Sequence, residues 1–214
     1  MRLTRLGHSC VRIEIAAAGV LVVDPGSAPF CDAAGALAGA DAVLVTHQHT
    51  DHLDVAALAA AYAANSDLAV FVPHDTVGAI NDAGARATGV GPGESFTAAG
   101  LDVRTYGGTH ATVHPDFPVP QNVGFLIGSA ILHPGDSFVL PDVAVETLLV
   151  PAAAPWLKIS ESIDYLRAAG APRAFPIHDA ILSDAGLGLV DRLLGGANES
   201  TAYERLAVGA SVEL

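Results

Sequence analysis

Short apolar and alternating stretches recur along the chain and predict β-strands, because successive side chains of a strand face opposite sides of a sheet. Residues 10–15 alternate apolar and polar side chains, as a half-buried strand does. Residues 20–24 form an apolar run that ends in Asp24-Pro25-Gly26, where proline lacks a backbone donor and glycine permits a turn. Further strands are predicted at residues 42–45, 68–73, 101–106, 122–127, 130–132, 148–150, 173–177 and 206–214.

Helices are predicted where small and apolar residues recur with helical spacing between suitable end signals. The predicted helices cover residues 55–65, 75–83, 160–169 and 187–194, with Asp75 and Ser160 as N-caps and Gly170 as a C-terminal stop. Each half of the chain begins with strands and later acquires helices, so two sheets packed face to face with helices outside would bury both strand sets. We therefore expect an α/β fold in one domain, residues 1–214.

Composition favours a protein with a large core and no membrane segment. Hydrophobic residues make up 51% of the chain. The longest apolar run, residues 55–64, is far shorter than the roughly 20 residues that a spanning helix needs. The first ten residues lack the apolar centre of a secretory signal, so we expect a cytoplasmic location. The two cysteines, Cys10 and Cys31, cannot form a disulfide framework, and Cys10 is expected to be a small buried hydrophobe.

The net charge of −13 argues against nucleic acid as a partner, because phosphate binding requires a basic surface. Anionic substrates stay open, since a bound dication can invert the local potential. We expect a small-molecule substrate, because the chain has no basic arm or extra domain to hold RNA or protein. A homo-oligomer is an open alternative, because an apolar and acidic chain could bury some of its surface in one.

The densest chemistry lies between the predicted strand at residues 42–45 and the helix that follows it. His47, His49, Asp51 and His52 fall within six residues there. Imidazole nitrogen and carboxylate oxygen are the donors that zinc, manganese and iron sites use. His47 and His49 can point the same way from an extended turn, whereas Asp51 and His52 can address a second point nearby. The cluster therefore predicts parts of two metal sites and completes neither.

Residues that could complete the sites come much later in the sequence. His110, Asp136 and His178 each follow a predicted strand directly, as His47 does. Strand ends on one edge of a sheet converge in space, so these side chains can reach a common point. For the last position, Asp179 or His133 could stand in for His178. We expect a metal centre built from strand ends.

The sequence resembles the metallo-β-lactamase superfamily, whose motif His-x-His-x-Asp-His matches His47, His49, Asp51 and His52. The later ligands of the superfamily match His110, Asp136 and His178 in order. The segments Leu6-Gly7-His8-Ser9 and Val23-Asp24-Pro25 are similar to the small branch that contains ascorbate-6-phosphate lactonase-like proteins and uncharacterised metal-dependent hydrolases. The resemblance covers nearly the whole chain.

The resemblance implies a four-layer αββα sandwich with the metal site at one edge, between the two sheets. It implies two divalent metal ions, with zinc as the first choice and manganese, iron or nickel as alternatives. The first ion would be held by His47, His49 and His110, the second by Asp51, His52 and His178, and Asp136 would bridge them. A hydroxide shared by the ions would attack the substrate, because metal binding lowers the pKa of water to about 7. Asp51 would also accept or shuttle a proton.

Several residues outside this set invite two readings. Asp24 could fix a ligand histidine through its outer nitrogen, or simply cap a turn. His8 could line the site, orient a ligand or be structural, and His114 could contact substrate from the proline-rich loop at residues 115–120. We expect His74 and His133 to be structural or surface residues. Trp156 follows a proline in a loop and could form a wall of the site, but we favour packing in the core.

These features predict a dinuclear metal-dependent hydrolase of a small-molecule lactone, ester or phosphodiester. One alternative is a metal-holding binding or sensor protein with little catalysis. Another is a phosphodiesterase that acts on a nucleotide or lipid. A di-iron redox enzyme on this fold would be expected to carry a carboxylate at position 49, and His49 argues against it. Lys158 is the only lysine, which weakens the expectation of a dedicated phosphate clamp.

Overall fold

The computed structural model describes residues 1–15 and 19–214, and their strands form two mixed sheets. The first sheet contains, in spatial order, β14 (Ser211–Glu213), β1 (Arg2–Gly7), β2 (Cys10–Ile15), β3 (Gly19–Val23), β4 (Ala42–Leu44), β5 (Ala69–Pro73) and β6 (Thr88–Val90). The second contains β13 (Ala202–Tyr203), β12 (Arg173–Ile177), β11 (Thr147–Pro151), β10 (Ile131–His133), β9 (Val123–Ile127), β8 (Leu101–Gly107) and β7 (Ser95–Ala98).

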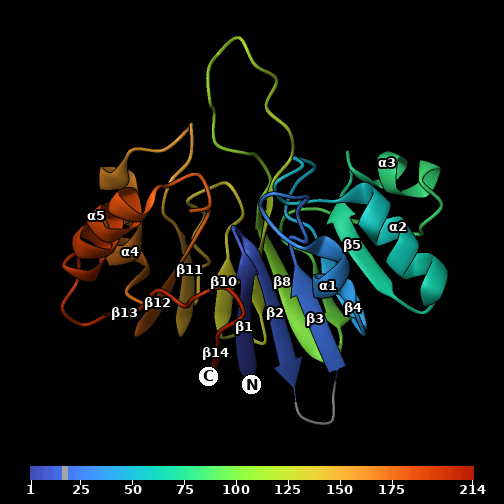
Figure 1. Ribbon diagram of the computed structural model, residues 1–214, viewed down its shortest axis with the longest axis horizontal. Coiled ribbons are helices and arrows are strands. Elements are labelled where there is room, and N and C mark those ends of the chain that lie inside the picture. The colour runs from blue at the N-terminus through green and yellow to red at the C-terminus, as the bar shows by residue number, and fades with distance from the viewer. Residues whose placement is uncertain (16–18) are drawn as a thin grey trace.

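Helices cover the outer face of each sheet (Figure 1). The first sheet is flanked by α1 (Ala33–Leu37), α2 (Val55–Ala64) and α3 (Val77–Asp82), and the second by α4 (Ile159–Ala169) and α5 (Asp184–Gly195). A central core joins the inner faces of the two sheets, and two outer cores lie between each sheet and its helices. The expected four-layer αββα sandwich is confirmed.

Strand β3 shows why this sequence forms four layers. Leu21 and Val23 point into the core between the sheets, whereas Val22 points into the core beneath α1 and α2. A strand that is covered on both faces needs apolar residues at every position, which is why residues 20–23 read as a continuous apolar run. In the second sheet, Leu149 faces the partner sheet while Leu148 and Val150 face α4.

The ends of several strands meet at one edge of the sandwich. Strand β3 is parallel to β4, with Val23 beside Leu44 at their carboxyl ends. In the second sheet β11 is parallel to β12, and Pro151 lies beside Ile177. Figure 1 shows the loop between β8 and β9 projecting from this edge, which is opposite the two termini. Every segment that follows one of these strand ends therefore begins near the same place.

Local details of the sequence-based expectations need correction. The N-cap of α3 is Thr76, not Asp75, because the Asp75 carboxylate accepts instead from the backbone N–H of Gln121, at 2.9 Å. The N-cap of α4 is Lys158, not Ser160, and the Glu161 carboxylate accepts from the Lys158 N–H at 2.6 Å. Gly170 does end α4, in a left-handed conformation with φ 58°.

Two further boundaries differ from the expectations, and one helix was not expected at all. The strand expected over residues 206–214 is limited to β14, because residues 206–210 make turn contacts with β1 instead. Helix α5 begins at Asp184, earlier than residue 187. The sequence patterns did not predict α1, a five-residue helix that Asp32 caps by accepting from the Gly35 N–H.

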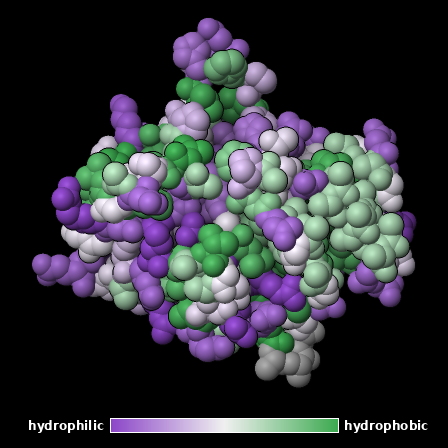
Figure 2. Space-filling model, in the orientation of Figure 1, coloured by the Kyte–Doolittle hydropathy of each residue, from purple (hydrophilic) through white to green (hydrophobic). Residues whose placement is uncertain are grey.

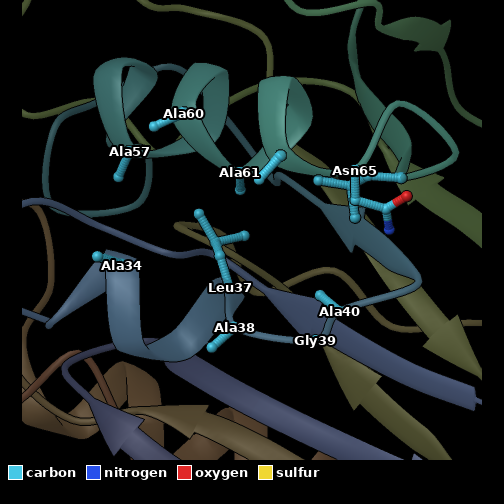
Figure 3. Close-up of a pocket in the computed structure, with 11 residues that line it drawn as sticks. Ala34, Leu37, Ala38, Gly39, Ala40, Ala57, Ala60, Ala61 and Asn65 are labelled. Carbon is cyan, nitrogen blue, oxygen red and sulfur yellow. The ribbon is translucent and has the colours of Figure 1, made fainter.

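Helix α2 is apolar on all sides, yet it buries fully only Leu58 among its described residues. Figure 2 shows pale green residues gathered at the right of the molecule, where Figure 1 places α2. A groove of about 230 Å³ separates α2 from α1 and is lined mainly by alanines (Figure 3). Within residues 1–15 and 19–214, no helix combines the length and the apolar character that crossing a membrane requires.

Candidate metal centre

The seven residues expected as ligands come together at the edge where the strand ends meet. His47, His49, Asp51 and His52 lie on the segment between β4 and α2. His110, Asp136 and His178 follow β8, β10 and β12. The short gaps between each strand and its residue leave little freedom, so the rigid sheets set the positions of these side chains.

Two sets of donors face each other across the site. The first, the three-histidine group, consists of His47, His49 and His110, whose donor atoms all lie within 4.8 Å of one another. The second, the carboxylate group, consists of Asp51, His52 and His178, with donor atoms within the same limit. A separation of this size lets one cation contact all three donors of a group, since metal-to-donor distances are about 2 Å.

Asp136 lies between the two groups. Its Oδ1 atom is 3.1 Å from Nε2 of His52, and its Oδ2 atom is 3.0 Å from Nε2 of His178. The same Oδ2 atom is 3.2 Å from Nε2 of His110, which belongs to the three-histidine group. This position allows one carboxylate to serve both groups, as expected for a bridging ligand.

The outer nitrogen of each buried ligand histidine has a hydrogen-bond partner. His52 Nδ1 pairs with Asp24 Oδ2 at 2.7 Å, and His178 Nδ1 pairs with the carbonyl of Ala153 at 2.6 Å. His110 Nδ1 pairs with its neighbour's carbonyl at 2.5 Å. A carbonyl or carboxylate can only accept, so in these three rings Nδ1 carries a proton and Nε2 is turned toward the centre.

The inner nitrogens have no such partners. Among the described residues, Nε2 of each of four buried histidines makes no hydrogen bond of acceptable geometry, and these are His47, His52, His110 and His178. Three of them lie within 3.2 Å of an Asp136 oxygen, but all three crowd onto that one carboxylate. Asp136 Oδ1 is likewise buried without one. Buried polar atoms without partners are costly and rare in proteins, so their convergence needs a cause. The donor set fits divalent metal ions, which would satisfy all of these atoms at once.

Asp24 supports one histidine of each group from the side away from the centre. Its carboxylate is fully buried and accepts from the backbone N–H and the hydroxyl of Thr46, each at 2.7 Å. The Thr46 hydroxyl oxygen lies 3.0 Å from His47 Nδ1 and can accept its proton. Asp24 therefore holds His52 directly and His47 through Thr46. Of the two readings of Asp24, the geometry matches the one in which it fixes a ligand histidine.

Burial and neighbouring charges set the protonation of the cluster. Burial, reinforced by His52, lowers the pKa of His47 well below its usual value, and burial together with His110 lowers the pKa of His49. Burial also disfavours the His52 cation, but Asp136 and Asp24 outweigh it and raise the pKa of His52 well above its usual value. The two carboxylates therefore favour a positive charge between them, which a metal ion supplies.

His8 is close to the carboxylate group, but its hydrogen bonds give it a supporting role and not that of a ligand. Its Nδ1 accepts from the Ala180 N–H at 3.2 Å, so Nε2 carries the proton and donates to Asp51 Oδ2 at 3.3 Å. Burial lowers the pKa of His8 to about 4, which keeps the ring neutral. With both nitrogens engaged, His8 orients the carboxylate of Asp51 and has no lone pair left for a metal.

Three residues of this edge have left-handed backbone conformations, with φ of 32° at His8, 51° at Asp24 and 59° at His178. Such conformations cost on the order of 1 kcal/mol or more outside glycine and persist where surrounding contacts impose them. Each of the three makes a hydrogen bond at the centre. The strain aims these side chains inward.

Other residues named from the sequence lie outside the centre. His114 is exposed on the projecting loop, where its Nδ1 accepts from the Asp116 N–H at 3.2 Å. His74 is exposed beside Glu94. His133 is fully buried and pairs with the Ser9 carbonyl at 2.9 Å, which makes it structural. Asp179 is buried in ion pairs with Arg5 and Arg205 and is not free to replace His178.

Trp156 lies at the centre, which was the less favoured of its two readings. Core packing was preferred for it, but its indole N–H donates to Asp136 Oδ2 at 2.8 Å. The indole ring lies 6.2 Å from the rings of both His110 and His178. A tryptophan in a loop after a proline carries no local signal for this contact, because the contact depends on how β10 and β11 bring their ends together.

Comparisons with known proteins agree with this geometry. A family model described as the beta-lactamase superfamily domain matches residues 2–178. Protein Rv0786c of Mycobacterium tuberculosis is 39% identical over 194 residues, which are 88% of this chain and 89% of that protein. A protein of Methanoculleus marisnigri named UPF0173 metal-dependent hydrolase is 27% identical, over 83% of this chain and 80% of its own length.

Among solved structures, the metallo-beta-lactamase fold protein YhfI of Bacillus subtilis superposes with a TM-score of 0.76. The match covers 99% of each chain at 15% sequence identity. At that identity the likeness concerns the fold alone.

Proposed function

Because the chain belongs to the β-lactamase superfamily and has the metallo-β-lactamase fold, we propose that it is a metal-dependent hydrolase with a dinuclear centre. The observation that carries this proposal is the set of four buried Nε2 atoms that converge without hydrogen bonds while their outer nitrogens are fixed. His47, His49 and His110 would hold one ion, Asp51, His52 and His178 the other, and Asp136 both.

Two divalent ions in this position would lower the pKa of a water molecule and stabilise negative charge on the substrate. Zinc is our first choice, because the donors are mainly neutral imidazoles, and manganese, iron and nickel are the alternatives. The bond that breaks would belong to a small-molecule lactone, ester or phosphodiester. Hydrolysis adds water across that bond and requires a group that receives a proton.

Asp51 is the residue that we propose for proton transfer. Its side chain is 23% exposed, so it can reach both the centre and solvent. Burial opposes its ionisation, but the hydrogen bond from His8 and the charge of His52 outweigh burial and lower its pKa to about 2. Asp51 is therefore a carboxylate at neutral pH, suited to holding a metal ion and to accepting a proton only transiently.

The test is a metal and activity assay on protein purified without chelator. We expect about two metal ions per chain and turnover of at least one of γ-butyrolactone, methyl butanoate and bis-p-nitrophenyl phosphate. The control is Asp51→Ala, which removes a ligand and the proton acceptor. Metal content below one ion per chain would sink the dinuclear proposal. Full metal content with no turnover above the Asp51→Ala protein would favour a metal-holding binding or sensor protein.

A further inference from the structure

A hollow of about 280 Å³ opens beside the three-histidine group. On one side it is lined by His49 and His110. On the other side it is lined by the loop between β8 and β9, through Ala111 and an apolar wall that consists of Val113, Phe117, Pro118, Val119 and Pro120. An object in this hollow would touch the apolar wall and two of the proposed ligands at the same time.

The apolar wall is unusually exposed. Val113 is 44% exposed, Phe117 61% and Val119 42%. Single exposed apolar residues are normal on protein surfaces, but a contiguous group beside a polar centre marks a binding surface. Figure 2 shows green residues beneath purple ones at the projecting end of the molecule, where this loop lies.

The loop that carries the wall is fixed at its base. Its two arms are joined by backbone hydrogen bonds from His110 to Pro120, at 3.1 Å, and from Gly108 to Asn122, at 2.8 Å. Pro118 and Pro120 restrict the backbone further. A surface that is already ordered loses little conformational entropy when a ligand binds. The part of the hollow formed by His110 and Pro120 is therefore fixed before a ligand binds.

The lining also limits the charge of the occupant. Neither arginine nor lysine lines the hollow in the described part of the chain. Arg5 and Arg205 are engaged with Asp179 on the other side of His178. An anionic group such as a phosphate would have no cationic side chain to pair with in the hollow, so only a metal ion at the centre could offset its charge.

Resting on the proposed function, we infer that the substrate is an uncharged molecule whose apolar group lies in this hollow while its scissile bond lies at the metal centre. The volume suits a group the size of one aromatic ring or a chain of about six carbons, because an apolar cavity of about 150 Å³ binds benzene. This occupant differs from a sugar phosphate, the kind of substrate that the lactonase-like branch suggested. The groove between α1 and α2 (Figure 3) is also apolar, but none of its lining residues belongs to the metal centre.

The first experiment measures hydrolysis of methyl esters and γ-lactones of increasing chain length. The rate is monitored through the protons that the acid product releases. We expect kcat/KM to rise at least about twofold for each methylene added up to about six carbons, since full burial of a methylene is worth about fourfold. Val119→Lys places a charge in the wall and should reduce the ratio of hexanoate to acetate turnover at least tenfold. Val143→Lys is the matched control, because Val143 is also 42% exposed and does not line the hollow.

The second experiment measures binding of N-phenyl-1-naphthylamine, a neutral apolar dye, and needs no turnover. Val119→Lys should weaken dye binding at least tenfold, and Val143→Lys should not. Should Val119→Lys fail to fold, Val119→Thr gives the same test with a side chain of equal shape.

The two experiments separate the two claims. Turnover that does not depend on chain length, with equal behaviour of the position 119 and position 143 variants, overturns the inference and leaves the hydrolase proposal standing. Absence of all turnover counts against the hydrolase proposal, and the dye then decides whether the hollow is an apolar site. Equal dye binding by both variants overturns the inference in that case too.

Discussion

The two donor groups of the centre differ in how firmly their ligands are held. In the carboxylate group, His52 is fixed by Asp24, His178 by the Ala153 carbonyl, and Asp51 by His8. In the three-histidine group, His49 is exposed, and no hydrogen bond between described residues fixes its ring. In one half of the centre every ligand is fixed by a hydrogen bond, whereas the other half has an exposed ligand, His49, that no such bond fixes.

This difference suggests that the two groups have different roles in binding metal and substrate. Partners behind a metal ligand typically change metal affinity by 10- to 100-fold, so the carboxylate group should bind its ion more tightly. The three-histidine group faces the hollow beside the apolar wall, through His49 and His110. We propose that the carboxylate group mainly retains metal and that the three-histidine group meets the substrate.

The most severe test of this comparison removes the residue that both groups share. Asp136→Asn should weaken metal binding at both groups by more than about 100-fold, exceeding the usual effect of an outer partner, because a direct charged ligand is lost. Metal content after dialysis, measured by mass spectrometry, should fall from about two ions per chain to nearly none. Retention of one tightly bound ion would mean that Asp136 belongs to a single group.

A more selective test removes the support behind the ligands. Asp24→Asn should weaken the carboxylate group by about 10- to 100-fold through His52, and the three-histidine group less, because Thr46 intervenes. It should also lower the free energy of unfolding by about 3 kcal/mol, since a buried charged acceptor of three hydrogen bonds is replaced. Titration with a chelator and urea unfolding measure the two effects.

Asp32→Asn is the control for this variant. Asp32 caps α1 from an exposed position, and asparagine caps a helix about as well as aspartate. Asp32→Asn should change neither the metal affinity nor the free energy of unfolding. Equal weakening of both metal groups by Asp24→Asn would contradict the difference in support.

Much of this centre could be expected from the sequence, for a definite physical reason. His47 and His178 follow apolar strands that needed burial on both faces, and parallel strands of this kind bring their ends to one edge. His110 follows β8, which alternates buried and exposed residues and is antiparallel to both neighbours, so its place was expected from the end of an alternating strand. The αββα layers follow from the same apolar runs. Asp24 could be noticed because an acid at the end of a buried strand needs a partner.

What escaped the sequence depends on contacts between distant segments. Trp156 reaches Asp136 only because β10 and β11 are neighbours in the second sheet. Asp75 looked like a helix cap, but Gln121, 46 positions away, takes its carboxylate. The exposed ring of His49 and the bonded ring of His8 look alike in sequence, because a histidine's hydrogen bonds are set by tertiary structure.

The support of Asp51 can be tested through pH. Burial lowers the pKa of His8 to about 4, below the roughly 6.5 of an unfolded histidine. Between these values the unfolded chain binds the proton more readily, so stability falls as the pH is lowered from about 6.5 toward 4. In metal-free protein, His8 should cause the free energy of unfolding to fall by about 2 kcal/mol between pH 7 and pH 5. The fall between these pH values should be smaller by that amount in His8→Asn.

Urea unfolding at both pH values in the presence of a chelator gives the measurement. His74→Asn serves as the control, because His74 is exposed and should contribute no difference. An unchanged pH dependence in His8→Asn would mean that His8 is protonated in the folded protein. It could then not act as the neutral donor that orients Asp51.

The smallest effect should come from Trp156, which contacts one ring from each group. Trp156→Phe keeps an aromatic ring but removes the hydrogen bond to Asp136 Oδ2, so metal affinity should change by less than about tenfold. Since Asp136 serves both groups, the change should be similar at the two ions. Tyr106→Phe is the control, because it removes a donor to the exposed Asp142. Trp156 is the only tryptophan, so its fluorescence in the unaltered protein should change at each step of metal binding. A fluorescence change at only one step would mean that Trp156 senses the ion of one group alone. Trp156 would then support one group only, and the difference in support between the two groups would be larger.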